Sequence, residues 1–184
     1  MSLSAILRTR LRGRVVVIGV GNPWRGDDGV GCRVAARLRA GGQVPTLDAE
    51  EIPESFLGDI VAGRPETAVF VDAVDFGAPP GAVALLDSSQ LGRYPSSTHR
   101  ASLSLLMELV TTVTGADVFL LAIQPRRIDL FGPMTEAVAS SADHLAALIE
   151  EALAAWAEAV EEPGSGRGQS LPAPGPGAEA RGSS

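Results

Sequence analysis

The sequence contains little that would place the protein in a membrane or outside the cell. A single cysteine, Cys32, excludes an intrachain disulfide and favours a reducing compartment. No apolar run approaches the ~20 residues that a membrane-spanning helix requires. The N-terminal segment has too short an apolar part and too many arginines to be a secretory signal. We therefore expect a cytoplasmic protein without a membrane partner.

Excess positive charge and several common catalytic motifs are also missing. The net charge is −7, and no basic stripe could neutralise phosphates, so we expect no nucleic-acid partner. The sequence has neither an HExxH zinc-protease motif nor a GxSxG nucleophile elbow. A dinucleotide fingerprint is excluded as well, because Gly19 and Gly21 match it but Trp24 stands in the place of the third glycine.

The length and the hydrophobic content of the chain predict one globular domain. The chain has 184 residues, of which 45% are hydrophobic, and this is enough for a single buried core. We assign residues 14–162 to this domain. Residues 1–13 are predicted to be a flexible, frayed lead-in, and residues 163–184, rich in Gly, Pro, Ser and Ala, a disordered tail.

Apolar stretches alternate with amphipathic ones along the domain. Strands are predicted at 15–18, 44–48, 67–73, 82–87 and 117–124, with the fourth nearer an edge. Helices are predicted at 30–38, at 53–62, from His99 to Val110, and from Pro133 through Trp156. This alternation predicts a three-layer α/β/α sandwich around a twisted, mostly parallel sheet of about five strands.

Three polar residues occupy positions that favour a shared site. Asp28 follows the first strand, Asp72 closes the strand at 67–73, and His99 begins a helix. In an open α/β sheet, ligands bind outside the carboxyl ends of the strands. Two carboxylates and an imidazole suit a divalent metal of intermediate hardness, such as nickel or zinc.

Each of these residues also has a structural interpretation. Asp27 and Asp28 stand where a helix should begin, and either could be its cap or a first-turn acid. Asp72 could form a turn, and His99 could be an ordinary surface histidine. Cys32 and His99 could form a thiol-protease pair, although a small buried packing residue is the favoured interpretation of Cys32.

Four segments together resemble the nickel–iron hydrogenase maturation endopeptidases. They are GVGNPWRGDDGVG at 19–31, FVDAVDFGAPPGAVALLD at 70–87, STHRASLSLLMEL at 97–109 and AIQPRRIDLFGPMTEAV at 122–138. They follow the family order, and the resemblance is closest to the branch that serves the formate-hydrogenlyase type of hydrogenase. It implies a twisted five-stranded sheet between helices.

The resemblance also implies an activity and a set of residues. These enzymes remove a C-terminal extension from the hydrogenase large-subunit precursor after nickel has been inserted. By position, the catalytic and nickel-contacting residues are Asp28, Asp72 and His99. Asn22, Asp27 and Asp48 match further family positions and are expected to bind substrate. The nickel would come with the precursor, and zinc or cadmium could occupy the same site.

No attacking nucleophile is apparent in the sequence. We expect the metal to orient the precursor's tail, and either the metal or a nearby carboxylate to activate a water. The sequence Asp48-Ala-Glu-Glu51 departs from the glycines that often follow this acid in the family. Two other functions stay open: a non-catalytic nickel-checking chaperone of the precursor, and a phosphorylase-like or aminopeptidase-like hydrolase on a similar fold.

Overall fold

The computed structural model describes residues 2–92 and 98–161, with the backbone alone described at 98–100 and 161. Its centre is a five-stranded sheet in the order β2-β1-β3-β5-β4. The first four strands are parallel, and β4 pairs with β5 in the antiparallel sense. The strands are β1 (Val15–Val20), β2 (Thr46–Glu50), β3 (Thr67–Ala73), β4 (Val83–Leu86) and β5 (Asp117–Ile123). This confirms the predicted fold class, including the edge position of the fourth strand.

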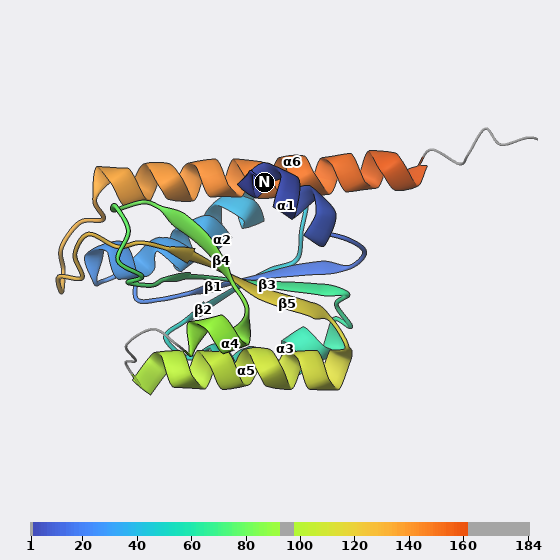
Figure 1. Cartoon of the computed structure of the whole chain (residues 1–184), viewed down its shortest axis with the longest axis horizontal. Coiled ribbons are helices and arrows are strands. Elements are labelled where there is room, and N and C mark those ends of the chain that lie inside the picture. The colour runs from blue at the N-terminus through green and yellow to red at the C-terminus, as the bar shows by residue number, and fades with distance from the viewer. Residues whose placement is uncertain (1, 93–97, 162–184) are drawn as a thin grey trace, which may run out of the picture.

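Helices cover both faces of this sheet (Figure 1). On one face lie α1 (Leu3–Arg10), α2 (Val30–Gly41) and α6 (Glu136–Glu161); on the other lie α3 (Leu57–Ala62), α4 (Ser88–Leu91) and α5 (Thr98–Thr114). Two 3₁₀ turns, Gly26–Gly29 and Pro53–Phe56, precede α2 and α3. The single helix predicted at 53–62 is therefore a 3₁₀ turn followed by a short helix.

The alternation of side chains along the central strands builds two apolar cores. Val17 of β1 and Val71 of β3 face α2 and α6, whereas Ile18 and Phe70 face α5, and all four side chains are fully buried. Strands buried on both faces need continuous apolar sequence, which explains why the strands at 15–18, 67–73 and 117–124 were predictable.

The N-terminal segment differs from the prediction. Residues expected to be a frayed lead-in form α1, whose Leu7 is 0% exposed and packs in the core beside α6. The Ser2 hydroxyl accepts a hydrogen bond from Ala5 N at 3.3 Å and caps the helix. Arg10 pairs with Asp117 and lies 4.2 Å from the Phe119 ring centroid. The segment is thus fixed to the sheet by apolar burial and by charge.

The range of β2 and the C-terminal tail also have to be compared with the prediction. Strand β2 spans Thr46–Glu50, so Asp48 lies within the strand and not at its end. The predicted disordered tail at 163–184 lies outside the described residues.

Candidate functional site at the carboxyl edge of the sheet

The carboxyl ends of the four parallel strands all lie on the same side of the sheet. We call this side the carboxyl edge, and the loops that follow the strands lie together there. Residues 21–29 follow β1, residues 74–82 follow β3, and residues 124–135 follow β5. Figure 1 shows these loops together beyond the end of the sheet at which α5 and α6 begin. The predicted site residues come from the elements and loops that meet at this edge.

Gly21 brings two of the predicted residues together. Its φ is 127°, and a Cβ added there would lie 1.8 Å from the Asp28 carbonyl oxygen and 3.7 Å from Asp72 Oδ1. Only glycine tolerates this backbone conformation and this close approach. The loop after β1 therefore folds back so that Asp28 and Asp72 both lie beside Gly21, as their positions at strand ends predicted.

The carboxylates of Asp28 and Asp72 are both half-buried and hydrogen-bonded. Asp28 Oδ2 accepts from the Asn22 backbone N–H at 3.3 Å, and Asp72 Oδ1 accepts from the Ala73 backbone N–H at 2.8 Å. Each of these bonds restricts the orientation of its carboxylate. The Asn22 side chain itself accepts from Trp24 N at 2.8 Å, so it stabilises the turn.

The backbone of His99 lies at the same edge. Helix α5 has 17 residues and ends at Thr114, just before β5 begins at Asp117 on the opposite edge. At 1.5 Å per residue it is ~25 Å long, which is about the length of a seven-residue strand at ~3.3 Å per residue. Its first turn therefore lies at the carboxyl edge. In β3, Asp72 points to the same face of the sheet as Phe70, two residues earlier, and this is the face that α5 covers.

The predicted meeting of all three ligands stays a prediction. Among the side chains that the structure describes, no three His, Cys, Asp or Glu residues form a group that could hold a metal ion. The His99 side chain lies outside that part of the chain. The two acids and the start of α5 are thus placed at one edge.

Asp48 lies on the other face of the sheet. It is opposite Gly19 in the β1–β2 register, and a Cβ on Gly19 would contact Gly31 and Ala35 of α2. The Asp48 Oδ1 atom is buried and has no hydrogen-bond partner among the described residues. Its carboxylate therefore faces α2 and lies near the Cys32 thiol.

Cys32 is the small packing residue that the sequence favoured. Its side chain is buried, and Sγ donates to Gly21 O at 3.3 Å. Burial raises the pKa of the Cys32 thiol far above its usual value, and the nearby carboxylate of Asp48 raises it further. A thiol that stays protonated is a poor nucleophile, so the geometry argues against a thiol protease.

Asp27 has a different position from the one predicted. Its side chain is 0% exposed, and its carboxylate accepts hydrogen bonds from Thr135 N at 2.6 Å, Arg126 N at 2.8 Å and Arg127 N at 3.1 Å. Burial alone would raise the pKa of Asp27, but these hydrogen bonds outweigh it and the pKa is lowered. The carboxylate therefore holds the loop at 126–135 against the 3₁₀ turn.

This arrangement corrects the interpretation of Asp27 and Asp28 as helix caps. The N-cap of α2 is Gly29, and no side chain caps it. The buried Asp27 carboxylate is also closed to direct contact with a substrate in this conformation. No sequence motif indicates this role, because the partners of Asp27 are mainly backbone N–H groups about a hundred residues away.

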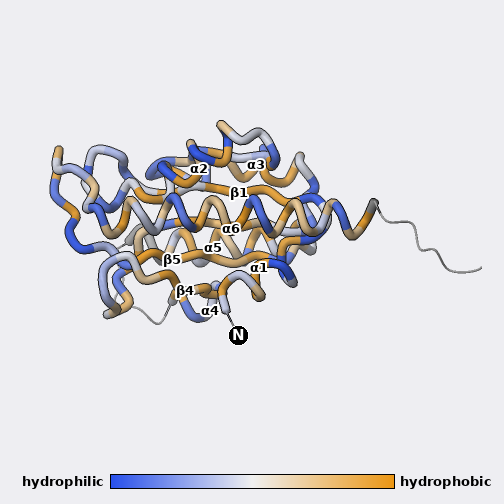
Figure 2. The backbone as a smooth tube through the Cα atoms, turned by 90° about the horizontal axis from the view of Figure 1, so that it is seen from above, coloured by the Kyte–Doolittle hydropathy of each residue, from blue (hydrophilic) through white to orange (hydrophobic). Residues whose placement is uncertain are grey.

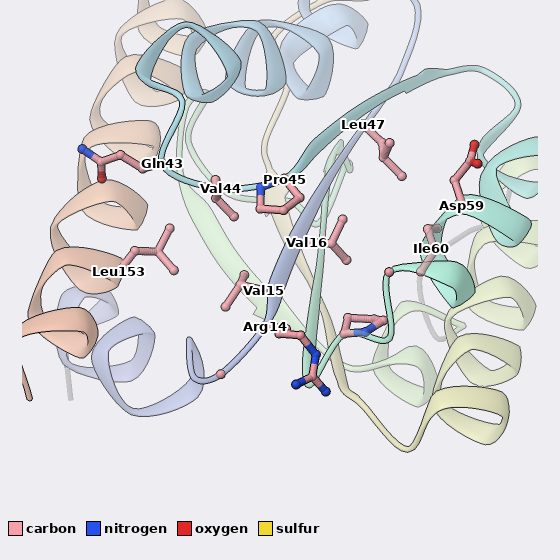
Figure 3. Close-up of a pocket in the computed structure, with 13 residues that line it drawn as sticks. Arg14, Val15, Val16, Gln43, Val44, Pro45, Leu47, Asp59, Ile60 and Leu153 are labelled. Atoms are coloured by element: carbon pink, nitrogen blue, oxygen red, sulfur yellow. The ribbon is translucent and has the colours of Figure 1, made fainter. Parts of the chain in front are cut away.

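A separate apolar pocket lies at the opposite edge of the sheet. Figure 3 shows it between the starts of β1 and β2, with Val15, Val44 and Leu153 among its lining residues. Its two labelled charged side chains, Arg14 and Asp59, come from different elements, and none of the predicted site residues lines it. The candidate site is therefore the carboxyl edge.

Comparison with known proteins identifies the family. The family model described as hydrogenase maturation protease matches residues 30–152. The chain belongs to the hydrogenase maturation protease family. The Hydrogenase 3 maturation protease of Escherichia coli K12 is 31% identical over 126 residues, which is 67% of this chain and 80% of that protein.

Solved structures agree with this assignment. The hydrogenase maturation protease HycI from Thermococcus kodakarensis KOD1 superposes with a TM-score of 0.73 at 35% identity, covering 81% of this chain and 99% of that one. The endopeptidase HycI from Escherichia coli gives a TM-score of 0.69 at 26% identity, covering 75% and 90%. The three-layer fold is therefore that of the hydrogenase maturation proteases, and the chain is a peptide hydrolase.

Within residues 2–92 and 98–161, no helix combines the length and the apolar character needed to cross a bilayer.

Proposed function

We propose that this hydrogenase maturation protease removes the C-terminal extension from the precursor of a nickel–iron hydrogenase large subunit once nickel is in place. The observation that carries the proposal is the position of Asp28 and Asp72, which lie beside Gly21 at the carboxyl edge of the sheet. The family assignment supports the reaction class, and the site supports recognition of a metal.

In this proposal Asp28, Asp72 and His99 contact the nickel that the precursor carries. Two carboxylates and one imidazole without a thiolate make a weak, unsaturated ligand set for nickel. Such a set completes the coordination of an ion already bound by substrate cysteines better than it holds the ion alone. Docking would then report that nickel has been inserted.

The hydrolytic step needs a water near the scissile bond. We propose that the precursor's nickel orients the tail and that the metal or one of the two carboxylates activates this water. The buried, protonated Cys32 takes no part in this step. Zinc or cadmium could replace nickel at the site, and the expected cytoplasmic location stays a prediction.

The test is to mix the purified protein with nickel-loaded and nickel-free precursor and to measure the mass of the precursor over time. We expect only the nickel-loaded form to lose its C-terminal extension. Asp72→Asn keeps the size of the side chain but weakens its binding to a cation, and it should slow processing by at least ~100-fold. Asp59→Asn, an exposed acid on α3, is the control and should stay within about twofold of the unmodified protein.

The outcomes separate the proposal from the two other functions. Stable binding of the precursor without loss of mass would indicate a chaperone. Hydrolysis of short peptides or nucleosides in the absence of any hydrogenase subunit would indicate a general hydrolase. Equal processing of nickel-free precursor, or normal processing by Asp72→Asn, would overturn the metal-reading role.

A further inference from the structure

Two loops at the carboxyl edge expose large apolar side chains side by side. Trp24 is 68% exposed, Leu130 64%, Phe131 79% and Ile128 40%. We call these four residues the apolar loop surface. The chain has only two Trp and five Phe residues, and Trp24 and Phe131 are the two that are exposed; Phe70 and Phe119 are fully buried, and the other three are half-buried. Figure 2 shows hydrophobic stretches among the hydrophilic loops at this end of the molecule.

The apolar loop surface is held in place by the fold. The Phe131 backbone N–H donates to Trp24 O at 2.6 Å and joins the two loops. The buried Asp27 carboxylate binds the backbone at both ends of the second loop, at Arg126 and Thr135. Phe131 itself has a φ of 58°, a left-handed conformation that a bulky residue adopts only when its surroundings impose it. An apolar surface fixed in this way is preorganised to bind.

Three arginines lie in the same two loops as the apolar loop surface. Arg25, Arg126 and Arg127 are all exposed, although the chain as a whole carries a net charge of −7. Arg127 lies 3.5 Å from Asp129, whereas no carboxylate in the described part of the chain pairs with Arg25 or Arg126. A partner that fits this surface therefore offers large apolar side chains next to carboxylates.

The apolar loop surface is continuous with the candidate site. Trp24 N donates to Asn22 Oδ1 at 2.8 Å, and Asn22 N donates to Asp28 Oδ2 at 3.3 Å. A polypeptide whose metal centre reaches Asp28 and Asp72 would therefore have neighbouring residues within reach of Trp24 and the 126–134 loop. The two surfaces are close enough for one partner to place its metal at Asp28 and Asp72 and the residues around that metal on the apolar loop surface.

We propose that the apolar loop surface docks the hydrogenase large-subunit precursor through a segment that carries apolar side chains flanked by acids; this rests on the proposed function. A second copy of this chain fits less well. A stable interface buries ~800 Å² per partner, whereas each of the two aromatic side chains offers at most ~150–250 Å² and Leu130 and Ile128 offer less. A small surface suits an enzyme that must release its product.

Tryptophan fluorescence tests contact at this surface without depending on cleavage. In the Trp156→Phe variant, Trp24 is the only tryptophan, and addition of precursor should shift its emission to shorter wavelength as solvent is excluded. The matched Trp24→Phe variant retains Trp156, within α6, and its emission should not change. Unchanged Trp24 emission in the presence of saturating precursor would overturn the proposal.

Kinetics of precursor processing give a second, independent readout. Phe131→Ser and Arg126→Gln should each raise KM, the former by about tenfold, because side chains at the centre of an interface carry most of its binding energy. The kcat should stay within about twofold, since neither side chain is assigned to the chemical step. The control is Val160→Ser, which is 61% exposed near the end of α6. Val160 is 24 residues after the start of this helix at Glu136, which places the control ~36 Å from that start.

The results distinguish failure of this proposal from failure of the proposed function. If the precursor is shortened but KM and Trp24 emission do not respond, the docking surface is wrong and the proposed function stands. If emission responds but the precursor keeps its mass, the docking surface stands and the proposed function fails. A dimer that Phe131→Ser converts to monomers with unchanged KM would assign the surface to a second copy instead.

Discussion

Replacement of Asp27 by asparagine should destabilise the protein without removing any apolar contact. The Asp27 carboxylate accepts bonds from three backbone N–H groups at 2.6–3.1 Å and from the Thr135 hydroxyl at 2.9 Å. An amide of the same shape has one accepting oxygen and turns an N–H₂ group toward donors on the other side. At least one N–H of the 126–135 loop then loses its partner, and the remaining bonds lose the negative charge that strengthens them.

The size of this effect follows from the individual bonds. A hydrogen bond to a charged group contributes ~1.5–3 kcal/mol, and a buried donor left unpaired costs ~1–3 kcal/mol. We therefore expect Asp27→Asn to lower the free energy of unfolding by ~3 kcal/mol. For a domain of this size, each kcal/mol corresponds to ~2–4 °C, so Tm should fall by ~6–12 °C.

Thermal unfolding followed by circular dichroism at pH 7 measures this change. Asp59→Asn on α3 is the control, and it should alter stability by less than ~0.5 kcal/mol. Hydrogen exchange should show that protection is lost first in the loop at 126–135. If the free energy of unfolding falls by less than ~1 kcal/mol, the conclusion that this carboxylate holds the loop is refuted.

The same carboxylate predicts a pH dependence. Its pKa is lower in the folded protein than in the unfolded chain, because the hydrogen bonds outweigh the cost of burial. Its contribution to stability is therefore fully present above the unfolded value of ~3.9 and is lost as the pH falls through the folded value. The stability difference between the unmodified protein and Asp27→Asn should be constant from pH 5 to 8 and shrink below pH ~4.

Three further predictions concern other parts of the fold. Gly31→Ala would place a Cβ 2.2 Å from backbone oxygens of both β1 and β3 and should cost ~1–3 kcal/mol in thermal unfolding, whereas Gly58→Ala, with no atom within 4 Å, should not destabilise. Cys32→Ala should retain processing of the precursor; loss of activity in a folded variant would revive the thiol-protease interpretation. Leu7→Ala should cost ~2–5 kcal/mol in chemical denaturation, and a neutral result would mean that α1 does not pack on the core.

The central strands were predictable because their signals are local. Val15 to Ile18 and Thr67 to Ala73 are apolar on both faces, and no other element of this length requires that pattern. Strand β2 has a weaker signal, because it lies at an edge and its sequence alternates polar and apolar residues. Its predicted range was two residues too early, which placed Asp48 at the strand end.

The N-terminal helix also has a signal in the sequence. Leu3, Leu7 and Leu11 are spaced by four residues and form one face of a helix. The segment was predicted to be a frayed lead-in, and its arginines were used to exclude a secretory signal. In the structure Arg10 reaches Asp117 and Phe119, so its charge is part of the packing of α1 on the sheet.

Some residues of the candidate site could be predicted from the sequence and others could not. Asp28 and Asp72 could be predicted to lie together because the ends of parallel strands meet at one edge. The role of Asp27 could not be predicted, since its partners are backbone groups at Arg126, Arg127 and Thr135, which have no signature in the sequence. The exposure of Phe131 likewise depends on a turn that the sequence alone does not fix.

A crystal structure of the protein soaked in zinc, with the ion located by anomalous scattering, tests most directly whether the three predicted ligands meet at one metal site. If Asp28, Asp72 and His99 share one site, one ion will lie within ~2.0–2.2 Å of carboxylate oxygens of Asp28 and Asp72 and ~2.0–2.1 Å from a ring nitrogen of His99. An imidazole directed away from both carboxylates, or an ion bound by a different set of side chains, would contradict this shared site.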